Sequence, residues 1–305
     1  MSLIVIGSVA LDDIETPFGK ADKIVGGAAP FACLAASYFY DKVKLVAIIG
    51  HNFPKSEIGV WHDHHINTDG LQIDEDRENF YWSGKYHTDM NSRDTLETGL
   101  NVLEDFDPVI PDSYQDCEYL LLANLAPSTQ QAAIKRLKKR PKLIVMDTMN
   151  FWMDIALDDL MQTLKMIDVL TINDAEARQL SGEYSLVKAA NKILTMGPKY
   201  LVIKKGEHGA LLFGEGKIFS APALPLEEVF DPTGAGDTFA GGFIGYMAKV
   251  GSVNFNNMKN GLIYGSALAS FCVEKFGTEK LKNLTNDEVA QRVQQFVSLS
   301  RFEIG

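Results

Sequence analysis

One short stretch of the chain combines glycines with a carboxylate in a way that suits chemistry on an anion. The sequence DPTGAGDTFAGG begins at Asp231 and leads into a segment with helical patterning. Gly234 and Gly236 permit backbone angles and close approaches that other residues do not. Together with Ala235, they would place successive amide N–H groups at a helix start, which is an anion-binding arrangement. Asp237 stands at the same helix start.

The carboxylate of Asp237 has two interpretations on local grounds. Aspartate is a favoured residue at a helix N-terminus, where its side chain caps free N–H groups. Phosphoryl transfer, by contrast, requires a group that orients the attacking hydroxyl and accepts its proton, and donors that neutralise the moving phosphoryl group. Asp237 and the three residues before it would supply both within one helical turn. The local pattern leaves capping and catalysis open.

The elements that must position this stretch indicate an α/β protein. Short apolar runs alternate with amphipathic segments, as in a parallel sheet covered by helices on both faces. The predicted strands are 3–6, 43–49, 119–122, 143–146, 169–172 and 200–203, and the predicted helices are 28–39, 130–139, 186–196, 236–250, 257–274 and 286–298. We expect a single domain over residues 1–305.

Two segments break this rhythm, at about residues 12–26 and 71–100. The second contains Phe80, Trp82 and Tyr86 in alternation with polar residues, which favours half-exposed antiparallel strands. We expect both segments to form a small β lid outside the main sheet. Aromatic lid strands could also pair between subunits, which suggests a homodimer.

Composition restricts the partners and the location. The 305 residues carry a formal net charge of -11, and an acidic surface repels nucleic acids and anionic lipids, so neither is an expected partner. Cys33, Cys117 and Cys272 lie far apart, without the spacing of a disulfide framework or a zinc site. The N-terminal residues lack a signal-peptide pattern, and no apolar run is long enough to span a bilayer. We therefore predict a cytoplasmic protein.

The glycine-rich stretch strongly resembles the C-terminal signature of the ribokinase-like (PfkB) carbohydrate kinase family. Further motifs occur in the family's order: GSVALD and GGAAPFACLAA near the N-terminus, then NDAE at 173–176 and KKGEHGA at 204–210. The resemblance covers nearly the whole chain. It implies a doubly wound, mainly parallel α/β sheet flanked by helices, a small β-strand lid, and transfer of the γ-phosphoryl group of MgATP to an alcohol.

The resemblance also implies a role for each matched residue. Asp237 would be the catalytic base, and the residues before it would form the anion hole. The matched positions are Gly234, Ala235 and Gly236 for the anion hole; Asp12, Gly26 and Gly27 for the substrate; Asn173, Lys204, Gly206 and Gly209 for the nucleotide; Glu176 for Mg2+ through water; and Asp231 and Thr233 for a monovalent cation such as K+. Lys204 also has a plainer interpretation, as an exposed strand end.

Three positions depart from the pattern of this family. Ribokinases proper follow the double glycine with Lys and, slightly later, Asn, both of which reach the sugar, but here these residues are Ala28 and Phe31. A site without these polar partners discriminates sugar hydroxyls less well, so ribose is not favoured. Phe31 either packs against a substrate ring or belongs to the helix core. Asn52 replaces an aspartate that many relatives carry after the second strand.

Several polar residues outside these motifs have two interpretations each. The sequence WHDHH at 61–65 looks like a metal cluster, but no partner follows at ligand spacing, so a solvated helix is expected. Lys85 and Arg93 in the lid either meet a charged substrate group or keep an exposed strand edge soluble, and the edge role is favoured. Asp147 and Asn150 follow a buried strand, where they either meet a ligand or form a turn.

These patterns together predict an ATP-dependent kinase that phosphorylates a hydroxyl group of a small sugar or sugar-like substrate. Two alternatives stay open: a nucleoside kinase of the same family, and a non-catalytic regulator that binds a metabolite on the same fold. P-loop, dinucleotide-binding and nucleophile-elbow motifs are absent from the sequence.

Overall fold

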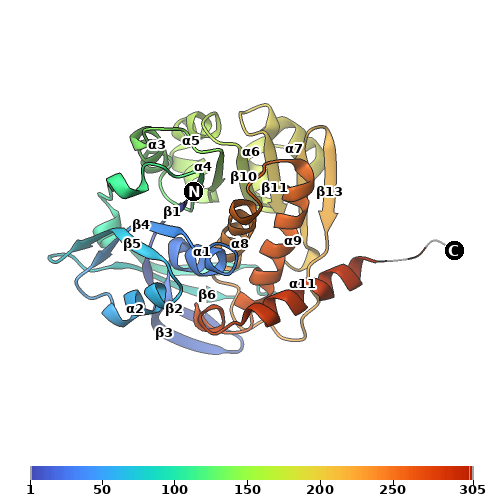
Figure 1. Cartoon of the computed structure of the whole chain (residues 1–305). Coiled ribbons are helices and arrows are strands. Elements are labelled where there is room, and N and C mark those ends of the chain that lie inside the picture. The colour runs from blue at the N-terminus through green and yellow to red at the C-terminus, as the bar shows by residue number, and fades with distance from the viewer. Residues whose placement is uncertain (1, 302, 304–305) are drawn as a thin grey trace.

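The core of the protein is a nine-stranded sheet in the order β13-β12-β11-β10-β9-β8-β1-β4-β5 (Figure 1). The computed structural model describes residues 2–301 and 303. The strands from β11 to β5 in this order pair in parallel, and β12 and β13 add an antiparallel edge. The strands are β1 (Leu3–Ile6), β4 (Val43–Gly50), β5 (Asn67–Asp74), β8 (Tyr119–Leu122), β9 (Leu143–Asp147), β10 (Val169–Asn173), β11 (Tyr200–Lys204), β12 (Ala210–Gly214) and β13 (Lys217–Ala221).

Helices cover both faces of this sheet. The helices are α1 (Ala28–Ser37), α2 (Lys55–Asp63), α3 (Pro127–Arg136), α4 (Asn150–Ile155), α5 (Leu157–Leu164), α6 (Asp174–Ser181), α7 (Leu186–Leu194), α8 (Ala235–Val250), α9 (Phe255–Cys272), α10 (Glu279–Lys282) and α11 (Asn286–Ser300). Within residues 2–301 and 303, no helix combines the length and the apolar character needed to cross a bilayer.

The two faces of the sheet form separate hydrophobic cores because successive strand residues point in opposite directions. Leu3 and Val5 of β1 belong to the core that contains α1, α8 and α9. Ile4 and Ile6 belong to the core that contains α3, α5, α6 and α7. This doubly wound, mainly parallel arrangement confirms the predicted fold class.

Helix α8, which carries the glycine-rich motif at its start, lies unusually close to α1. A Cβ atom on Gly241 would come within 2.2 Å of the carbonyl oxygen of Ala32, and one on Gly245 within 2.8 Å of the backbone of Ala36. Glycine is therefore required at both positions, because any side chain would separate the two helices. The contact fixes the start of α8 relative to the sheet.

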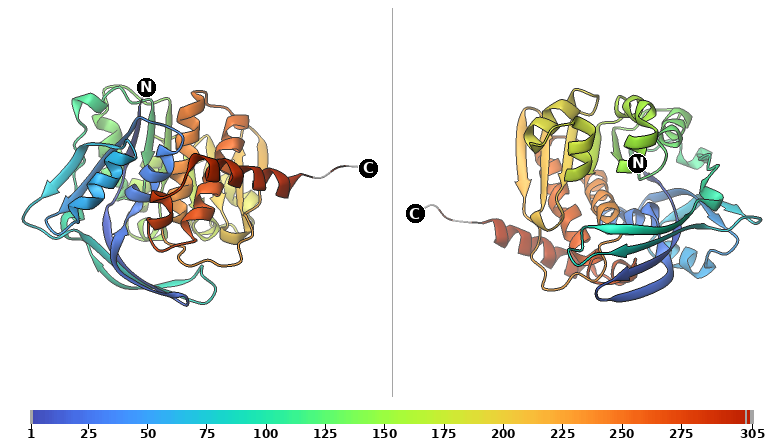
Figure 2. Two further views of the ribbon diagram at one scale, coloured as in Figure 1. Left: turned by 60° about the horizontal axis from the view of Figure 1, so that its bottom comes forward. Right: turned by 180° about the vertical axis from the view of Figure 1, so that it is seen from behind.

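A second, four-stranded sheet in the order β3-β2-β6-β7, which we call the lid sheet, lies at one end of the main sheet (Figures 1 and 2). Its strands are β2 (Ala10–Thr16), β3 (Gly19–Gly26), β6 (Phe80–Tyr86) and β7 (Arg93–Gly99). The two hairpins are antiparallel, but β2 and β6 pair in parallel. Residues 71–74, expected in the lid, belong to β5 of the main sheet.

The β2–β3 hairpin rests on the main body beside the glycine-rich motif. The rings of Phe18 and Phe230 have centroids 5.5 Å apart, and Gly19 lies against the ring of Phe276. Phe230 directly precedes the motif, so the lid sheet contacts the segment that leads into α8.

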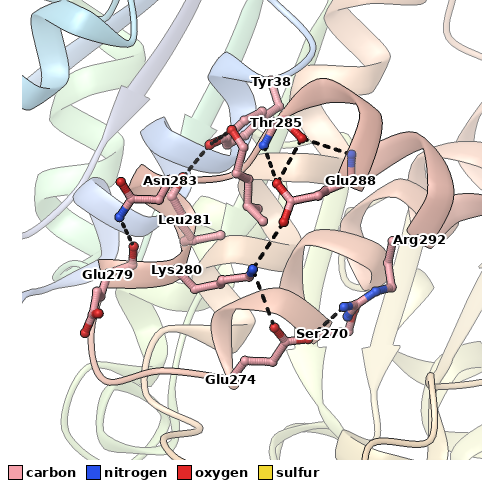
Figure 3. A network of polar contacts seen from close by, with 11 residues as sticks. Tyr38, Ser270, Glu274, Glu279, Lys280, Leu281, Asn283, Thr285, Glu288 and Arg292 are labelled. Atoms are coloured by element: carbon pink, nitrogen blue, oxygen red, sulfur yellow. Dashed lines mark hydrogen bonds and ion pairs between the residues drawn. The ribbon is translucent and has the colours of Figure 1, made fainter.

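Polar contacts fasten α11 to the end of α9 (Figure 3). Arg292 donates to Glu274 at 2.7 Å and to Ser270 at 2.8 Å, and its guanidinium stacks over the ring of Phe271 at 3.7 Å. Lys280 joins Glu274 to Glu288 on α11. The network holds in place the segment that follows α9. Within this segment, the N–H of Gly277 donates to Asp231 at the beginning of the glycine-rich stretch.

The close approach of α1 and α8 gives a first prediction. We expect Gly241→Ala to lower the free energy of unfolding by about 1–3 kcal/mol, because the added methyl group overpacks the contact with Ala32. The control is Gly59→Ala on the exposed surface of α2, where a Cβ meets nothing within 4 Å. That change should raise stability by about 0.5–1 kcal/mol. Urea unfolding midpoints measure both, and equal stability of the two variants would contradict the packing argument.

Candidate active site

The glycine-rich motif forms the N-terminus of α8. Gly234 is the N-cap residue and has a φ of 75°, in the left-handed region that glycine adopts most easily. The N–H of Ala235 donates to the carbonyl of Pro232, and the N–H of Thr238 begins the helical bonds by donating to Gly234. The N–H groups of Gly236 and Asp237 therefore have no intrahelical acceptor and are available to an anion.

Asp237 lies in the first turn of α8, whereas the N-cap residue is Gly234. No side chain among the described residues caps this helix. Its position weakens the capping interpretation. Burial, and after it the negative charge of Asp147, raise the pKa of Asp237 to about 7 against the opposing positive charges of Lys204 and Arg93. A carboxylate with a pKa near neutrality suits a general base at neutral pH.

Three polar residues end neighbouring strands at the carboxyl edge of the sheet, where ligands of open α/β sheets bind. They are Asp147 of β9, Asn173 of β10 and Lys204 of β11. The ammonium group of Lys204 lies 2.6 Å from Asp147, and both side chains are mostly buried, at 17% and 8% exposure. Lys204 is therefore not an exposed strand end.

The ammonium group of Lys204 also reaches the start of α8. It lies 3.0 Å from the position that a Cβ on Gly236 would occupy. Burial disfavours its charge, but Asp147, Glu176 and Asp237 outweigh this cost and raise the pKa of Lys204. Lys204 is thus a charged group at the centre of three carboxylates, beside the free N–H groups of α8.

The NDAE motif forms a capping box at the start of α6. The side chain of Asn173 accepts from the N–H of Glu176 at 2.8 Å, and Glu176 accepts from the N–H of Asn173 at 2.7 Å. Glu176 is 6% exposed, and burial raises its pKa to about 7 although Lys204 opposes the shift. The motif places a carboxylate beside the strand ends.

The KKGEHGA segment forms a tight loop between β11 and β12. Gly206 and Gly209 have φ angles of 53° and 80°, and a Cβ on Gly209 would lie 2.0 Å from the carbonyl of Ala221. The loop therefore requires glycine at Gly209. It follows Lys204 directly, so a nucleotide on this loop would have its phosphates near the buried ammonium group.

The predicted substrate residues come together on the other side of the motif. Asp12 is 3% exposed, and its Oδ1 has no hydrogen-bond partner among the described residues. A Cβ on Gly26 would lie 1.7 Å from Asp12, so the carboxylate rests on that glycine. Burial, and after it the negative charge of the nearby Asp231, raise the pKa of Asp12 to about 8. Gly27, with a φ of 80°, starts α1.

The positions that depart from the family pattern have structural contacts. Phe31 is 1% exposed, and its ring lies directly beneath Gly234, which favours the core interpretation over contact with a substrate. Asn52 accepts from the N–H of Asn79, and Asn79 in turn accepts from the N–H of Gly50. These bonds tie the end of β4 to the start of β6. Ala28 is buried and donates its N–H to Ser8.

The remaining polar residues separate into two groups. Asn150 faces Gln179. The histidine-rich segment runs over the end of α2, which stops at Asp63, so His64 and His65 follow the helix. His62, within α2, contacts Thr68. No metal-binding group of three or more His, Cys, Asp or Glu side chains occurs in the described part of the chain. Lys85 forms an ion pair with Glu15 at 2.5 Å on the exposed side of the lid sheet. Asp147, whose role was open, belongs to the site.

Asp231 is completely buried just before the motif. Its two carboxylate oxygens accept from the N–H groups of Thr233 and Gly277, each at 2.9 Å. These bonds close the segment after α9 over the start of α8. The cation-binding role of Asp231 and Thr233 stays a prediction.

Comparisons with known proteins agree with this geometry. Residues 5–285 match the model of the pfkB family carbohydrate kinases, so the chain belongs to this family. A cytidine kinase of Thermococcus kodakarensis is 32% identical over 247 residues, which cover 80% of this chain and 87% of the relative. The chain is therefore a kinase, and its acceptor belongs to the sugar and nucleoside class on which this family acts.

Solved structures extend the likeness in fold. The nucleoside kinase of Methanocaldococcus jannaschii has a TM-score of 0.76 and 20% identity, covering 97% of this chain and 99% of that one. A chain from Escherichia coli solved in complex with ATP and Mg2+ has a TM-score of 0.78 and 18% identity, covering 96% and 99%. At these identities the comparison concerns the fold alone.

The residues present fit MgATP. Free N–H groups at α8 and the ammonium group of Lys204 provide donors for phosphate oxygens, and Glu176 provides a carboxylate of the kind that holds Mg2+, directly or through water.

The charges around Asp237 predict a change in pH dependence. Asp147→Asn removes a negative charge that raises the pKa of Asp237, so this pKa falls and the base stays ionised at lower pH. With Asp237 as base, the acidic limb of the kcat/KM profile should move to lower pH, with relatively more activity retained at pH 6. Asn150→Ala, which changes a side chain that faces Gln179, is the control. A limb that moves to higher pH would contradict this electrostatic account.

Proposed function

We propose that this protein is an ATP-dependent nucleoside kinase. The observation that carries the proposal is an aromatic ring, that of Trp82, beside Asp12, the carboxylate expected to bind the substrate. Trp82 of β6 is the register partner of Asp12 on β2, so both side chains lie on the same face of the lid sheet. The cytidine and nucleoside kinases among the similar proteins support the same acceptor class.

The face that carries Trp82 is directed at the glycine-rich motif. Tyr86, four residues further along β6 and on the same face, accepts a hydrogen bond from Thr233 at 3.1 Å. The ring of Trp82 lies over Gly84, where a Cβ would come within 2.1 Å of it, and remains half-exposed. A half-exposed indole beside a buried carboxylate suits an acceptor with a flat base and a ribose hydroxyl.

The proposed reaction uses a short set of residues. Asp237 accepts the proton of the acceptor hydroxyl while its oxygen forms a bond to the γ-phosphorus. The bond from the γ-phosphorus to the bridging oxygen breaks, and ADP leaves. Bound MgATP supplies the phosphoryl group and the metal charge. The free N–H groups of Gly236 and Asp237, with Lys204, stabilise the charge on the moving group.

The other parts of the site have proposed roles that follow from their places. Asp12 accepts a hydrogen bond from a hydroxyl of the acceptor, since its buried Oδ1 has no partner among the residues that the structure describes. Gly26 leaves room for the carboxylate of Asp12, and Gly27 lets the backbone of Ser8 and Ala10 approach the start of α1. The N–H of Asn173 donates to Glu176 and would help to hold this carboxylate for Mg2+. Closure of the lid sheet would exclude water and limit hydrolysis of ATP.

Three further expectations stay predictions. A monovalent cation such as K+ would lie beside Asp231 and Thr233, where it would strengthen the anion site. A homodimer would form through the lid sheet, whose outer strand β7 is exposed along most of its length. A cytoplasmic location agrees with three buried, unpaired cysteines in the described part of the chain.

The role of Asp237 has a direct test. We expect Asp237→Asn to lower kcat by about 100-fold or more, because the variant cannot accept the proton. Binding of MgADP and the thermal unfolding midpoint should stay close to those of the unchanged protein. ADP release is the readout. A variant with a near-normal rate would exclude this base and would leave the proton to another group.

Trp82 tests the acceptor class. ADP release with cytidine, adenosine, inosine, ribose and fructose should be strongest with a nucleoside. Trp82→Ala should raise the KM for that nucleoside by about 10-fold or more, the loss expected for a stacked base, and change the KM for ATP little. Phe151→Ala, an exposed aromatic on α4, is the control. Preference for a free sugar would contradict the proposed nucleoside acceptor, but it would not contradict the assignment of the protein as a kinase.

A further inference from the structure

Asn79 lies where the lid sheet joins the main body of the protein. The chain passes between the two before β2, after β3, before β6 and after β7. Asn79 directly precedes β6, and the residue is 1% exposed. A side-chain amide that is shielded from water needs protein partners for its N–H groups and its oxygen, because an unpaired polar group is costly to bury. The partners of Asn79 therefore show what this junction holds together.

The side chain of Asn79 bonds both to the main sheet and to the two inner strands of the lid sheet. Its Oδ1 accepts from the N–H of Gly50 at 3.1 Å, at the end of β4. Its Nδ2 donates to the carbonyl of Val9 at 3.1 Å, directly before β2, and to the carbonyl of Phe80 at 3.0 Å, at the start of β6. Both N–H groups and the oxygen are thus satisfied, and one amide joins three strands.

The backbone of Asn79 is fastened as well. Its N–H donates to Oδ1 of Asn52 at 2.7 Å, and its carbonyl accepts from Nδ2 of Asn101 at 2.9 Å, shortly after β7. A Cβ on Gly50 would lie 2.3 Å from the backbone nitrogen of Asn79, so the end of β4 packs directly on this residue. Bonds from Asn79 therefore reach the crossings before β2, before β6 and after β7.

The strands that Asn79 joins carry the residues expected to face the acceptor. Ala10 and Phe80 form the first pair of the parallel β2–β6 ladder, and Asp12 and Trp82 form a pair two residues further on. The two carbonyls that Asn79 holds therefore stand at the start of both strands, close to these side chains. A change in the angle of the strands at this point would move both side chains relative to the proposed base, and small misplacements of a bound substrate are costly.

We propose that Asn79 is a positioning residue of the acceptor site, which fixes the angle between the lid sheet and the main sheet and so places Asp12 and Trp82. Since its amide is satisfied by the protein, Asn79 acts through these strands and not by contact with a ligand. The inference rests on the proposed role of Asp12 in holding the acceptor, and it is independent of which acceptor is used. Asn52 belongs to the same junction, because it accepts from the N–H of Asn79.

The first test needs no acceptor, since it measures amide hydrogen exchange of the free protein. We expect Asn79→Ala to accelerate exchange in residues 10–16 and 80–86 by about 10-fold or more, with little change in β10 and β11. The matched control is Gln131→Ala, which removes another buried amide, one that donates to the carbonyl of Asp159 at 2.9 Å and joins α3 to α5. Its effect should stay in these two helices. Equal exchange of the lid sheet in both variants would overturn the proposal.

The second test uses the acceptor with which the unchanged protein releases ADP fastest. We expect Asn79→Ala to raise the KM for this acceptor by about 10-fold or more, because Asp12 and Trp82 are no longer held in place. The share of ADP released without acceptor should also rise, since a loosened lid sheet admits water. Binding of MgADP, measured by calorimetry, should change by less than about twofold, because the nucleotide residues lie away from this junction.

A second pair of variants serves if Asn79→Ala unfolds, which thermal unfolding would show. Asn52→Ala removes the acceptor of the Asn79 N–H, whereas Asn52→Asp still offers it an oxygen. We expect the alanine variant to raise the KM for the acceptor and the aspartate variant to recover most of the loss. Weaker binding of MgADP in step with the acceptor, or an equal rise of this KM in Gln131→Ala, would overturn the proposal in favour of a general loss of stability. A free sugar as the best acceptor would contradict the proposed nucleoside acceptor alone, and the exchange result would stand.

Discussion

A single buried ammonium group organises the charged end of the main sheet. Lys204 ends β11 and faces Asp147 at 2.6 Å, while Glu176 and Asp237 approach it from α6 and α8. These three carboxyl groups are largely shielded from solvent, and burial of unpaired charge is costly. A cation beside them is therefore needed to stabilise their negative charge. The pair thus holds together elements from distant parts of the chain, and it leaves Asp237 with a pKa near neutrality.

Steric constraints position the same groups as strictly as charge does. The ring of Phe31 supports Gly234 from below, and the glycines of α8 let this helix press against α1. Each contact admits no larger residue, so the free N–H groups at the start of α8 have a fixed direction before any ligand arrives. Preorganised donors of this kind need no rearrangement during a reaction, which is the main source of their effect.

The sequence predicts the fold well where periodicity is strong. All six predicted strands are present and extend at most one residue further, because continuous apolar runs are typical of buried parallel strands. The motif residues also lie together around the start of α8. The parallel pairing of β2 with β6, the ion pair of Lys204 with Asp147 and the place of Phe31 beneath Gly234 depend on contacts between distant segments. No local sequence pattern indicates such contacts. The sequence alone therefore left two interpretations open for Lys204, Asp147 and Phe31.

The exposed outer strand of the lid sheet has a consequence beyond the single chain. Strand β7 starts at Arg93, and its outer edge offers N–H and carbonyl groups that pair with no other strand in the described part of the chain. Any strand that pairs with this edge would stiffen the hairpin and so alter the freedom of the residues that face the site. Association and turnover would then be linked, and the activity per subunit would depend on protein concentration.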